Sequence, residues 1–215
     1  MSTDKYDETY FERGIQSGVS GYDNYRWMPE LTIRMAHYIA SFLNLSENTP
    51  ILDYGCAKGY LVKAFRILDI PAFGCDISQY AISQCDPDVR NYCRLMDQGT
   101  IPFDGIFDTI LAKDVMEHLS EPEIDAFLKM AASRCKRLFH VTPLGDGTKF
   151  LIPQYEADVT HIQKQPLTWW LKKFESHGFA PLSVTHEMKG VKENWTRACH
   201  NGNGFFLFAN SGRPK

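Results

Sequence analysis

Hydrophobic residues fall along the chain in two alternating patterns, short unbroken runs and helically spaced rows. The runs are rich in β-branched and aromatic residues and predict strands at about 50–54, 72–76, 89–94, 106–112 and 137–142. The rows, in which apolar residues recur at helical spacing, predict helices over 27–43, 59–69, 79–84, 121–134 and 166–177. Strands that alternate with helices favour a parallel sheet covered by helices on both faces.

Two further β segments are expected near the end of the chain, at 180–187 and 204–209. No helix is predicted between them, so they should pair as an antiparallel hairpin at the sheet edge, with 201–204 as the turn. The predicted fold class is therefore α/β, a doubly wound and mostly parallel seven-stranded sheet with an antiparallel C-terminal edge hairpin.

The first 26 residues are polar but contain four tyrosines and three glycines, which is too aromatic for a typical disordered tail. We expect a loop or short helix that joins the helix at 27–43 in an N-terminal helical cap, residues 1–45. Residues 46–215 should form the catalytic α/β core of the same single domain. The tyrosines have two open interpretations, a lid in which Tyr22 and Tyr25 contact a ligand or ordinary packing of surface aromatics.

The composition is that of one globular domain, with 215 residues, 44% hydrophobic and 23% charged. The net charge of −3 argues against a large basic surface for duplex nucleic acid, although a local basic groove stays open. The polar N-terminus has no signal-peptide pattern, and no apolar run approaches the length of a bilayer, so no membrane association is expected. Six cysteines without a C-x-x-C pair predict buried reduced thiols and a cytoplasmic setting.

The most informative segment is a glycine turn that follows the first predicted strand, residues 53–59. Glycines let the backbone approach a ligand closely, and the following helix points its unpaired N–H groups at the same place. Asp76, at the end of the next strand, stands where an acid accepts hydrogen bonds from a ribose. Asp53 in the turn would repel a phosphate, so the segment favours a ligand with a positive charge such as a sulfonium. No G-K-[ST] follows, which excludes a triphosphate-binding loop as a sequence match.

This segment resembles motif I of the class I S-adenosylmethionine-dependent methyltransferases, an acid followed by three alternate glycines. Here the acid is Asp53 and the three positions are Gly55, Ala57 and Gly59, so alanine replaces the middle glycine. Further matches follow in order over about residues 48–145, and they are Asp76, Asp97, the strand at 107–110 and the segment 115–119. The resemblance implies a Rossmann-like methyltransferase fold, S-adenosyl-L-methionine as the cofactor and S-adenosyl-L-homocysteine as the product.

The resemblance also implies roles for individual residues. Asp53 would lie near the methionine ammonium, Asp76 would bind the ribose hydroxyls, and Asp97 with Gln98 would face the adenine. Lys113, at the end of the fourth strand, would border the methyl group, or it is simply a solvated lysine at a strand end. The full set expected at the cofactor is Asp53, Gly55, Cys56, Ala57, Gly59, Tyr60, Asp76, Ile77, Asp97, Gln98 and Lys113.

Two histidines are candidates for the group that removes a proton from the methyl acceptor. His118 follows Glu117 just beyond the fourth strand, where ligands bind in an open α/β sheet. His161 lies in the long connection 143–165, and similar Thr-His segments in small-molecule and sugar methyltransferases lie over the acceptor. Each histidine has a purely structural alternative, helix capping for His118 and a surface loop for His161. Their spacing with Glu117 has no zinc-motif character, so no metal is expected.

The sequence therefore predicts a transferase that moves a methyl group to an oxygen or nitrogen of a small molecule or sugar. Expected acceptor contacts are Tyr22, Tyr25, Glu117 and Trp169. Nucleic acid is disfavoured as an acceptor by the net charge and by the absence of an Asn/Asp-Pro-Pro-Tyr segment after the fourth strand. A protein or RNA methyltransferase and a non-catalytic cofactor-binding scaffold stay open as alternatives, as does a homodimer. A dehydrogenase is the weakest alternative, because Asp53 lies where its pyrophosphate would bind.

Overall fold

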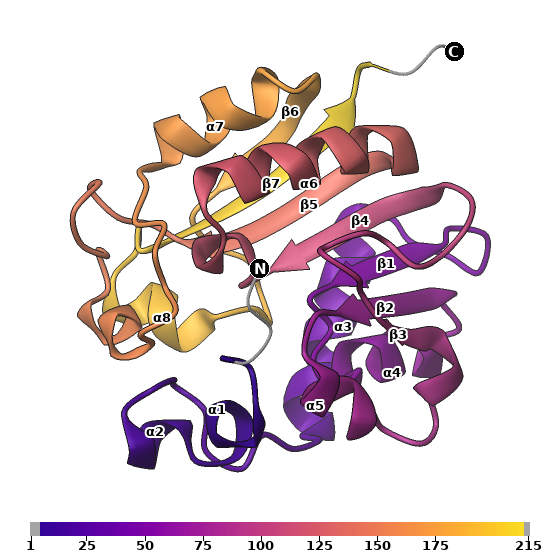
Figure 1. Ribbon diagram of the computed structural model, residues 1–215. Coiled ribbons are helices and arrows are strands. Elements are labelled where there is room, and N and C mark those ends of the chain that lie inside the picture. The colour runs from indigo at the N-terminus through magenta and orange to yellow at the C-terminus, as the bar shows by residue number, and fades with distance from the viewer. Residues whose placement is uncertain (1–4, 213–215) are drawn as a thin grey trace. The chain divides into compact units, whose positions relative to one another are not determined.

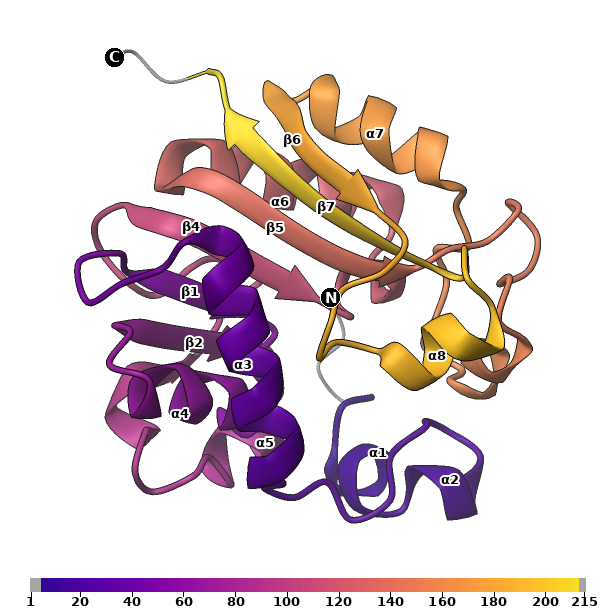
Figure 2. The same ribbon diagram turned by 180° about the vertical axis from the view of Figure 1, so that it is seen from behind.

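A computed structural model describes residues 5–212 (Figures 1 and 2). The described chain divides into two compact units. The first unit contains residues up to 104 together with Ala157–Thr160, and the second contains 105–156 and the residues from 161 onward. The strand order along the sheet is β3-β2-β1-β4-β5-β7-β6.

The first unit carries the N-terminal helices and three parallel strands. The helices of the cap are α1 (Glu8–Glu12), α2 (Gly14–Ser17) and α3 (Pro29–Leu43). They are followed by β1 (Ile51–Tyr54), α4 (Tyr60–Ile67), β2 (Ala72–Asp76), α5 (Gln79–Ser83), the 3₁₀ turn η1 (Arg90–Tyr92) and β3 (Cys93–Leu95). Strand β2 pairs in parallel with both β1 and β3. Helix α3 packs along α4, and Figure 2 shows α3 in front of β1 and β2.

Local sequence explains where several of these helices begin. The Asp7 carboxylate accepts a hydrogen bond from the Tyr10 N–H at 3.0 Å and caps α1. The Ser78 hydroxyl accepts one from the Ala81 N–H at 2.9 Å and caps α5. Pro29 occupies the first turn of α3, where its missing N–H leaves no hydrogen bond unmade. Capping thus places the start of α5 immediately after the acid that ends β2.

The second unit holds the four remaining strands. Its elements are β4 (Phe107–Lys113), the 3₁₀ turn η2 (Met116–His118), α6 (Glu121–Arg134), β5 (Cys135–Pro143), the turn η3 (Pro153–Ala157), α7 (Leu167–Glu175), β6 (Phe179–Thr185), α8 (Glu193–Ala198) and β7 (Asn203–Asn210). Strand β4 pairs in parallel with β5, while β7 is antiparallel to both β5 and β6. Helices α6 and α7 lie on one face of this group of strands (Figures 1 and 2).

These observations confirm the predicted α/β class, with a mostly parallel seven-stranded sheet and an antiparallel C-terminal pair at its edge. The expectation of a direct hairpin between the last two strands is wrong, because α8 lies between them. The predicted turn at 201–204 is right only for its first half. Asn201 and Gly202 lie in a turn that the Gly202 N–H closes on the Cys199 carbonyl at 3.0 Å, whereas Asn203 and Gly204 belong to β7. Helix α8 has only six residues and no capping side chain, so it leaves little signal in the sequence.

A histidine occupies the core of the second unit. His140 on β5 is fully buried, with its ring stacked on Phe174 and Phe206 and tilted against Trp170. Its Nδ1–H donates to the Ala112 carbonyl at 3.2 Å. Burial lowers the pKa of His140 to about 3, because the charged imidazolium would lose its hydration among aromatic rings. The ring is therefore neutral and serves as a packing residue.

This burial predicts a loss of stability in acid. An unfolded histidine binds a proton below about pH 6.5, whereas folded His140 resists it down to about pH 3. Stability should fall as pH drops through this window, because the unfolded state binds more protons. In His140→Leu, the stability difference from wild type should shrink by up to about 1.4 kcal/mol per pH unit as pH falls. Urea unfolding at pH 7, 6 and 5 measures the difference.

Leu138→Ala is the matched control, because it removes a fully buried side chain from the same strand without removing a titrating group. Its stability difference from wild type should stay constant with pH. A constant difference for His140→Leu as well would contradict the assignment of His140 as a buried neutral imidazole.

Candidate functional site

The turn after β1 has the backbone shape that the sequence predicts. Gly55, Ala57 and Gly59 all have positive φ, at 85°, 49° and 76°. The middle position thus demands a left-handed residue, and alanine accepts it at some cost in strain. The Gly55 and Cys56 N–H groups both donate to the Cys75 carbonyl, at 2.8 and 3.1 Å. The turn is therefore anchored to the neighbouring strand.

Asp76, at the end of β2, holds the other side of the turn. One carboxylate oxygen accepts the Ala57 N–H and the other accepts the Ser78 N–H, both at 2.8 Å. Burial raises the pKa of Asp76, and these backbone hydrogen bonds oppose the rise. Each carboxylate oxygen has a second lone pair, so the side chain can still accept hydrogen bonds from a ligand. Asp53, on β1, is also buried.

The residues expected at the adenine lie in the turn after β3. Asp97 forms an isolated bridge with Thr100, whose N–H donates to the Asp97 carbonyl at 2.9 Å. Gln98 has a φ of 49°, and both Asp97 and Gln98 are exposed. The Tyr54 hydroxyl donates to the Gly99 carbonyl at 2.9 Å, which ties this turn to the end of β1. The first unit thus contains the whole predicted cofactor set except Lys113, and Tyr60 and Ile77 directly follow the glycine turn and Asp76 respectively.

A lysine that the sequence analysis overlooked joins the N-terminal segment to the glycine turn. Lys58 is only 7% exposed, forms an ion pair with Glu12, and donates to the Tyr25 carbonyl at 2.9 Å. The ring of Tyr25 packs against Tyr22, with centroids 4.9 Å apart, and against Tyr60 at 5.4 Å. Burial, with the charge of Asp53 as a smaller contribution, raises the pKa of Tyr25. The two predicted tyrosines therefore belong to an aromatic layer beside the glycine turn.

The N-terminal segment has a second anchor that the sequence did not predict. The Tyr10 hydroxyl donates to the Asp158 carboxylate at 2.8 Å, and the Val159 N–H donates to the Val19 carbonyl at 3.2 Å. The other oxygen of Asp158 accepts the N–H and hydroxyl of Thr160, at 2.9 and 2.6 Å. An Asp-x-Thr sequence is typical of such a local turn, so this pattern could have predicted the turn from the sequence. Residues 157–160 are thus held by the cap of the first unit.

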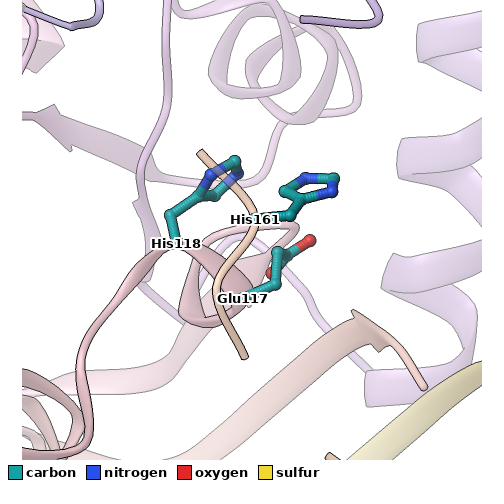
Figure 3. A group of neighbouring side chains, drawn as sticks. All are labelled: Glu117, His118 and His161. Carbon is teal, nitrogen blue, oxygen red and sulfur yellow. The ribbon is translucent and has the colours of Figure 1, made fainter. Parts of the chain in front are cut away.

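In the second unit the structure brings the consecutive residues Glu117 and His118 together with His161, which is distant in the sequence. Glu117 and His118 lie on η2, and His161 comes from the connection after η3 (Figure 3). One potential ligand atom from each side chain lies within 4.8 Å of the others, and the imidazole centroids are 4.6 Å apart. The Ile162 and Gln163 N–H groups both donate to the Glu117 carbonyl, at 2.8 and 2.9 Å. These two hydrogen bonds hold the loop with His161 against η2.

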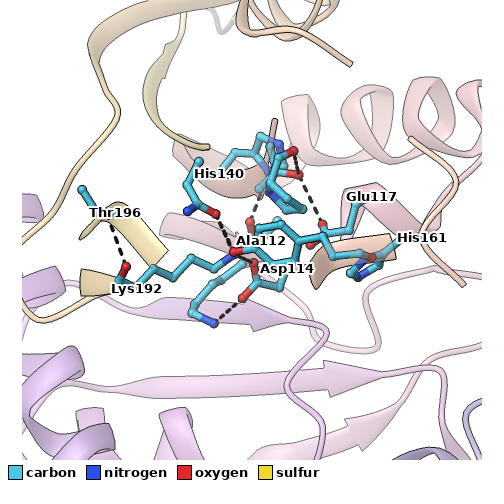
Figure 4. Close-up of polar contacts among 12 residues, drawn as sticks. Ala112, Asp114, Glu117, His140, His161, Lys192 and Thr196 are labelled. Atoms are coloured by element: carbon cyan, nitrogen blue, oxygen red, sulfur yellow. Dashed lines mark hydrogen bonds and ion pairs between the residues drawn. The ribbon is translucent and has the colours of Figure 1, made fainter. Parts of the chain in front are cut away.

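Two carboxylates near this cluster, those of Asp114 and Glu117, have different surroundings (Figure 4). Asp114 pairs with Lys113 at 2.6 Å and with Lys192, so these lysines hold its pKa well below the usual range even though burial opposes ionisation. Glu117 is 1% exposed, and burial, followed by the charge of Asp114, raises its pKa to about 8. The Thr142 hydroxyl lies 3.4 Å from its carboxylate. Asp114 and Lys192 both have left-handed backbones, with φ of 55° and 54°, so this ion pair joins two strained residues.

The remaining predicted residues have structural contacts. Lys113 is paired with Asp114, as described, and belongs to the second unit. Trp169 on α7 packs edge-on against Trp170, and the Lys173 ammonium lies 5.3 Å from its ring centre. The proposed ligand contacts of both residues stay predictions.

Comparison with known proteins decides the family. A family model described as a methyltransferase domain matches residues 25–184. The chain belongs to the methyltransferase domain family. A comparison with curated protein sequences finds no match.

Solved methyltransferases share the fold at low sequence identity. A methyltransferase bound to the activator Trm112 from Haloferax volcanii has a TM-score of 0.66 at 13% identity, over 87% of this chain and 93% of that one. A SAM-dependent methyltransferase from Archaeoglobus fulgidus has 0.63 at 17%, over 85% and 94%. The glycopeptide N-methyltransferase MtfA, complexed with sinefungin, has 0.62 at 13%, over 84% and 87%. These similarities confirm the Rossmann-like methyltransferase fold. Within residues 5–212, helices are too short or too polar to cross a bilayer.

The role of Lys58 gives a test. Lys58→Met removes the ion pair with Glu12 and the hydrogen bond to Tyr25. A charged hydrogen bond contributes about 1.5–3 kcal/mol, so amide hydrogen exchange over residues 8–25 should accelerate at least about tenfold. Lys129→Met, at an exposed position on α6, is the control and should leave the exchange unchanged. Unaltered exchange in Lys58→Met would show that the ion pair does not anchor the segment.

Proposed function

We propose that this methyltransferase family member uses S-adenosyl-L-methionine to methylate an oxygen or nitrogen of a small molecule or sugar. The observation that carries the proposal is the arrangement of Asp53, Asp76 and the turn between them. Two buried carboxylates flank a backbone with three positive φ angles. This site suits a ligand that combines a positive charge with a ribose diol, and it disfavours a phosphate.

The cofactor supplies a methyl group activated by a sulfonium and leaves as S-adenosyl-L-homocysteine. Asp76 would accept hydrogen bonds from the ribose hydroxyls, with its orientation held by Ala57 and Ser78. Asp53 would balance the positive charge of the amino-acid end, and the turn at 55–59 would pass its backbone beside it. Asp97 and Gln98 would face the adenine.

The acceptor must lose a proton as it is methylated, and His161 is the better placed base. Its Nδ1–H donates to the Tyr155 carbonyl at 2.8 Å, so in the neutral ring the lone pair is on Nε2. That hydrogen bond also fixes the ring orientation, which catalysis by proton transfer requires. His118, with its ring 4.6 Å away, is the alternative base. Glu117, Tyr22, Tyr25 and Trp169 stay proposed acceptor contacts, and Lys113 a proposed neighbour of the methyl group.

Several features favour a small acceptor. The chain has a net charge of −3, and the segment after β4 lacks the Asn/Asp-Pro-Pro-Tyr pattern. The glycopeptide N-methyltransferase MtfA, which is similar in fold, supports this choice of acceptor class. A methyltransferase of protein or RNA is the second candidate. The structure from Haloferax volcanii contains an activator chain, so a protein partner is part of this second candidate.

Calorimetric titration with S-adenosylmethionine and S-adenosylhomocysteine tests the cofactor assignment. Asp76→Asn should weaken binding by about 10- to 100-fold, because hydrogen bonds to a charged group contribute about 1.5–3 kcal/mol. Asp104→Asn, at an exposed acid of the same unit, should bind as wild type does. The proposal fails if wild type binds neither compound or if Asp76→Asn binds as tightly as wild type.

Methyl transfer from labelled cofactor to sugars, small metabolites, RNA and protein identifies the acceptor class. We expect labelling in the sugar or metabolite arm. His161→Gln should reduce turnover by about 100-fold or more while cofactor affinity is unchanged, as expected for a base. Labelling confined to RNA or protein would replace the small-acceptor assignment with the second candidate.

A further inference from the structure

The cluster of Glu117, His118 and His161 combines two imidazoles with one carboxylate (Figure 3). Their potential ligand atoms lie within 4.8 Å of one another. Around an ion with bonds of about 2.0–2.2 Å, such atoms are separated by about 3–3.5 Å. Small side-chain rotations would therefore bring all three onto one ion, with the backbone already in place.

The surroundings of the cluster orient these groups as metal sites do. A metal-binding histidine usually donates its other ring N–H to a carbonyl or carboxylate, which fixes the tautomer and the ring. His161 makes this contact through Nδ1, which donates to the Tyr155 carbonyl at 2.8 Å and so places the lone pair of that tautomer on Nε2. The Glu117 carbonyl accepts hydrogen bonds from the N–H groups of Ile162 and Gln163. These bonds hold the segment that carries His161 beside the segment that carries Glu117.

The charge balance also favours a cation. Glu117 is almost fully buried, and its carboxylate accepts a hydrogen bond from the Thr142 hydroxyl at 3.4 Å. The nearby lysines, Lys113 and Lys192, pair instead with Asp114. Burying a carboxylate is costly unless it is paired, and a divalent ion bound by Glu117 and the two imidazoles would reduce that cost.

We propose that Glu117, His118 and His161 bind a divalent first-row transition metal of the zinc, iron or manganese class. Two imidazoles disfavour Mg²⁺ and Ca²⁺, which prefer all-oxygen ligand sets. Three protein ligands leave positions open for an exogenous group. The chemical role of the metal rests on the proposed function. An acceptor hydroxyl would bind at an open position, where the metal would lower the pKa of that hydroxyl. It then releases its proton to solvent, and its oxygen bonds to the methyl carbon as the C–S electron pair returns to sulfur.

This site differs from the general-base interpretation in a measurable way. A histidine that binds a metal through Nε2 cannot also take the acceptor proton there. Activity of a metal-dependent enzyme should then be lost on chelation and restored by the added metal. A histidine base would give activity that is unchanged by chelation.

Direct metal binding is the decisive experiment. The full-length protein is dialysed against EDTA, and Co²⁺ is titrated in the absence of S-adenosylmethionine, followed by calorimetry and by visible absorption. We expect one Co²⁺ per chain with micromolar or tighter affinity and ligand-field bands that Zn²⁺ abolishes. His161→Gln and His118→Gln should each weaken binding by at least about 10- to 100-fold, the range found even for second-shell changes.

His200→Gln is a matched control, because His200 also lies beside another histidine, His186, and near Glu187. It should leave Co²⁺ binding unchanged. Glu117→Gln is the third ligand variant. If this variant does not fold, His118→Gln and His161→Gln, which are both at half-buried positions, are sufficient for the test. The proposal is overturned if Co²⁺ does not bind, if binding follows His200 instead, or if only Mg²⁺ binds. Because this titration contains no cofactor, its failure is distinct from a failure to bind S-adenosylmethionine.

Discussion

Carboxylates removed from water must be hydrogen-bonded, paired or protonated, and this constraint organises both units of the protein. Asp76 meets it with backbone N–H groups from the glycine turn and from Ser78. Asp114 meets it with two lysines. Glu117 accepts a hydrogen bond from the Thr142 hydroxyl at 3.4 Å, but burial and the charge of Asp114 still raise its pKa to about 8. The three solutions correspond to three roles: a preformed ligand acceptor, a structural ion pair and a group suited to bind a proton or cation.

The hydrogen bond between Ala57 and Asp76 serves the fold and the proposed site together. It holds a left-handed alanine in the turn, and it orients a carboxylate that would bind a ribose. Lys58, one residue further along, connects the same turn to Glu12 and Tyr25. The aromatic N-terminal segment is thus attached to the cofactor turn through charged and backbone contacts.

Sequence patterns predicted most of the fold because the patterns are local. The runs at β1, β2, β4 and β5 and the long helix α6 depend on residues within one element. Helix α8 was missed because its six residues lack a cap and an extended apolar face. The same distinction holds for the site. Asp53 and Asp76 were predicted from the turn that lies between them in sequence, whereas the partners of Lys58 and Asp158 come from a different segment of the chain.

The sequence by itself determined the α/β class, the methyltransferase family and the acids that flank the glycine turn. These features depend on strand and helix periodicity and on backbone needs that a few adjacent residues express. Only the tertiary structure decided that Glu117, His118 and His161 share one cluster. Their spacing matches no metal motif, and they meet because the loop after η3 folds back and donates two backbone hydrogen bonds to Glu117. Loop closure over such a separation depends on packing throughout the unit, which no local pattern records.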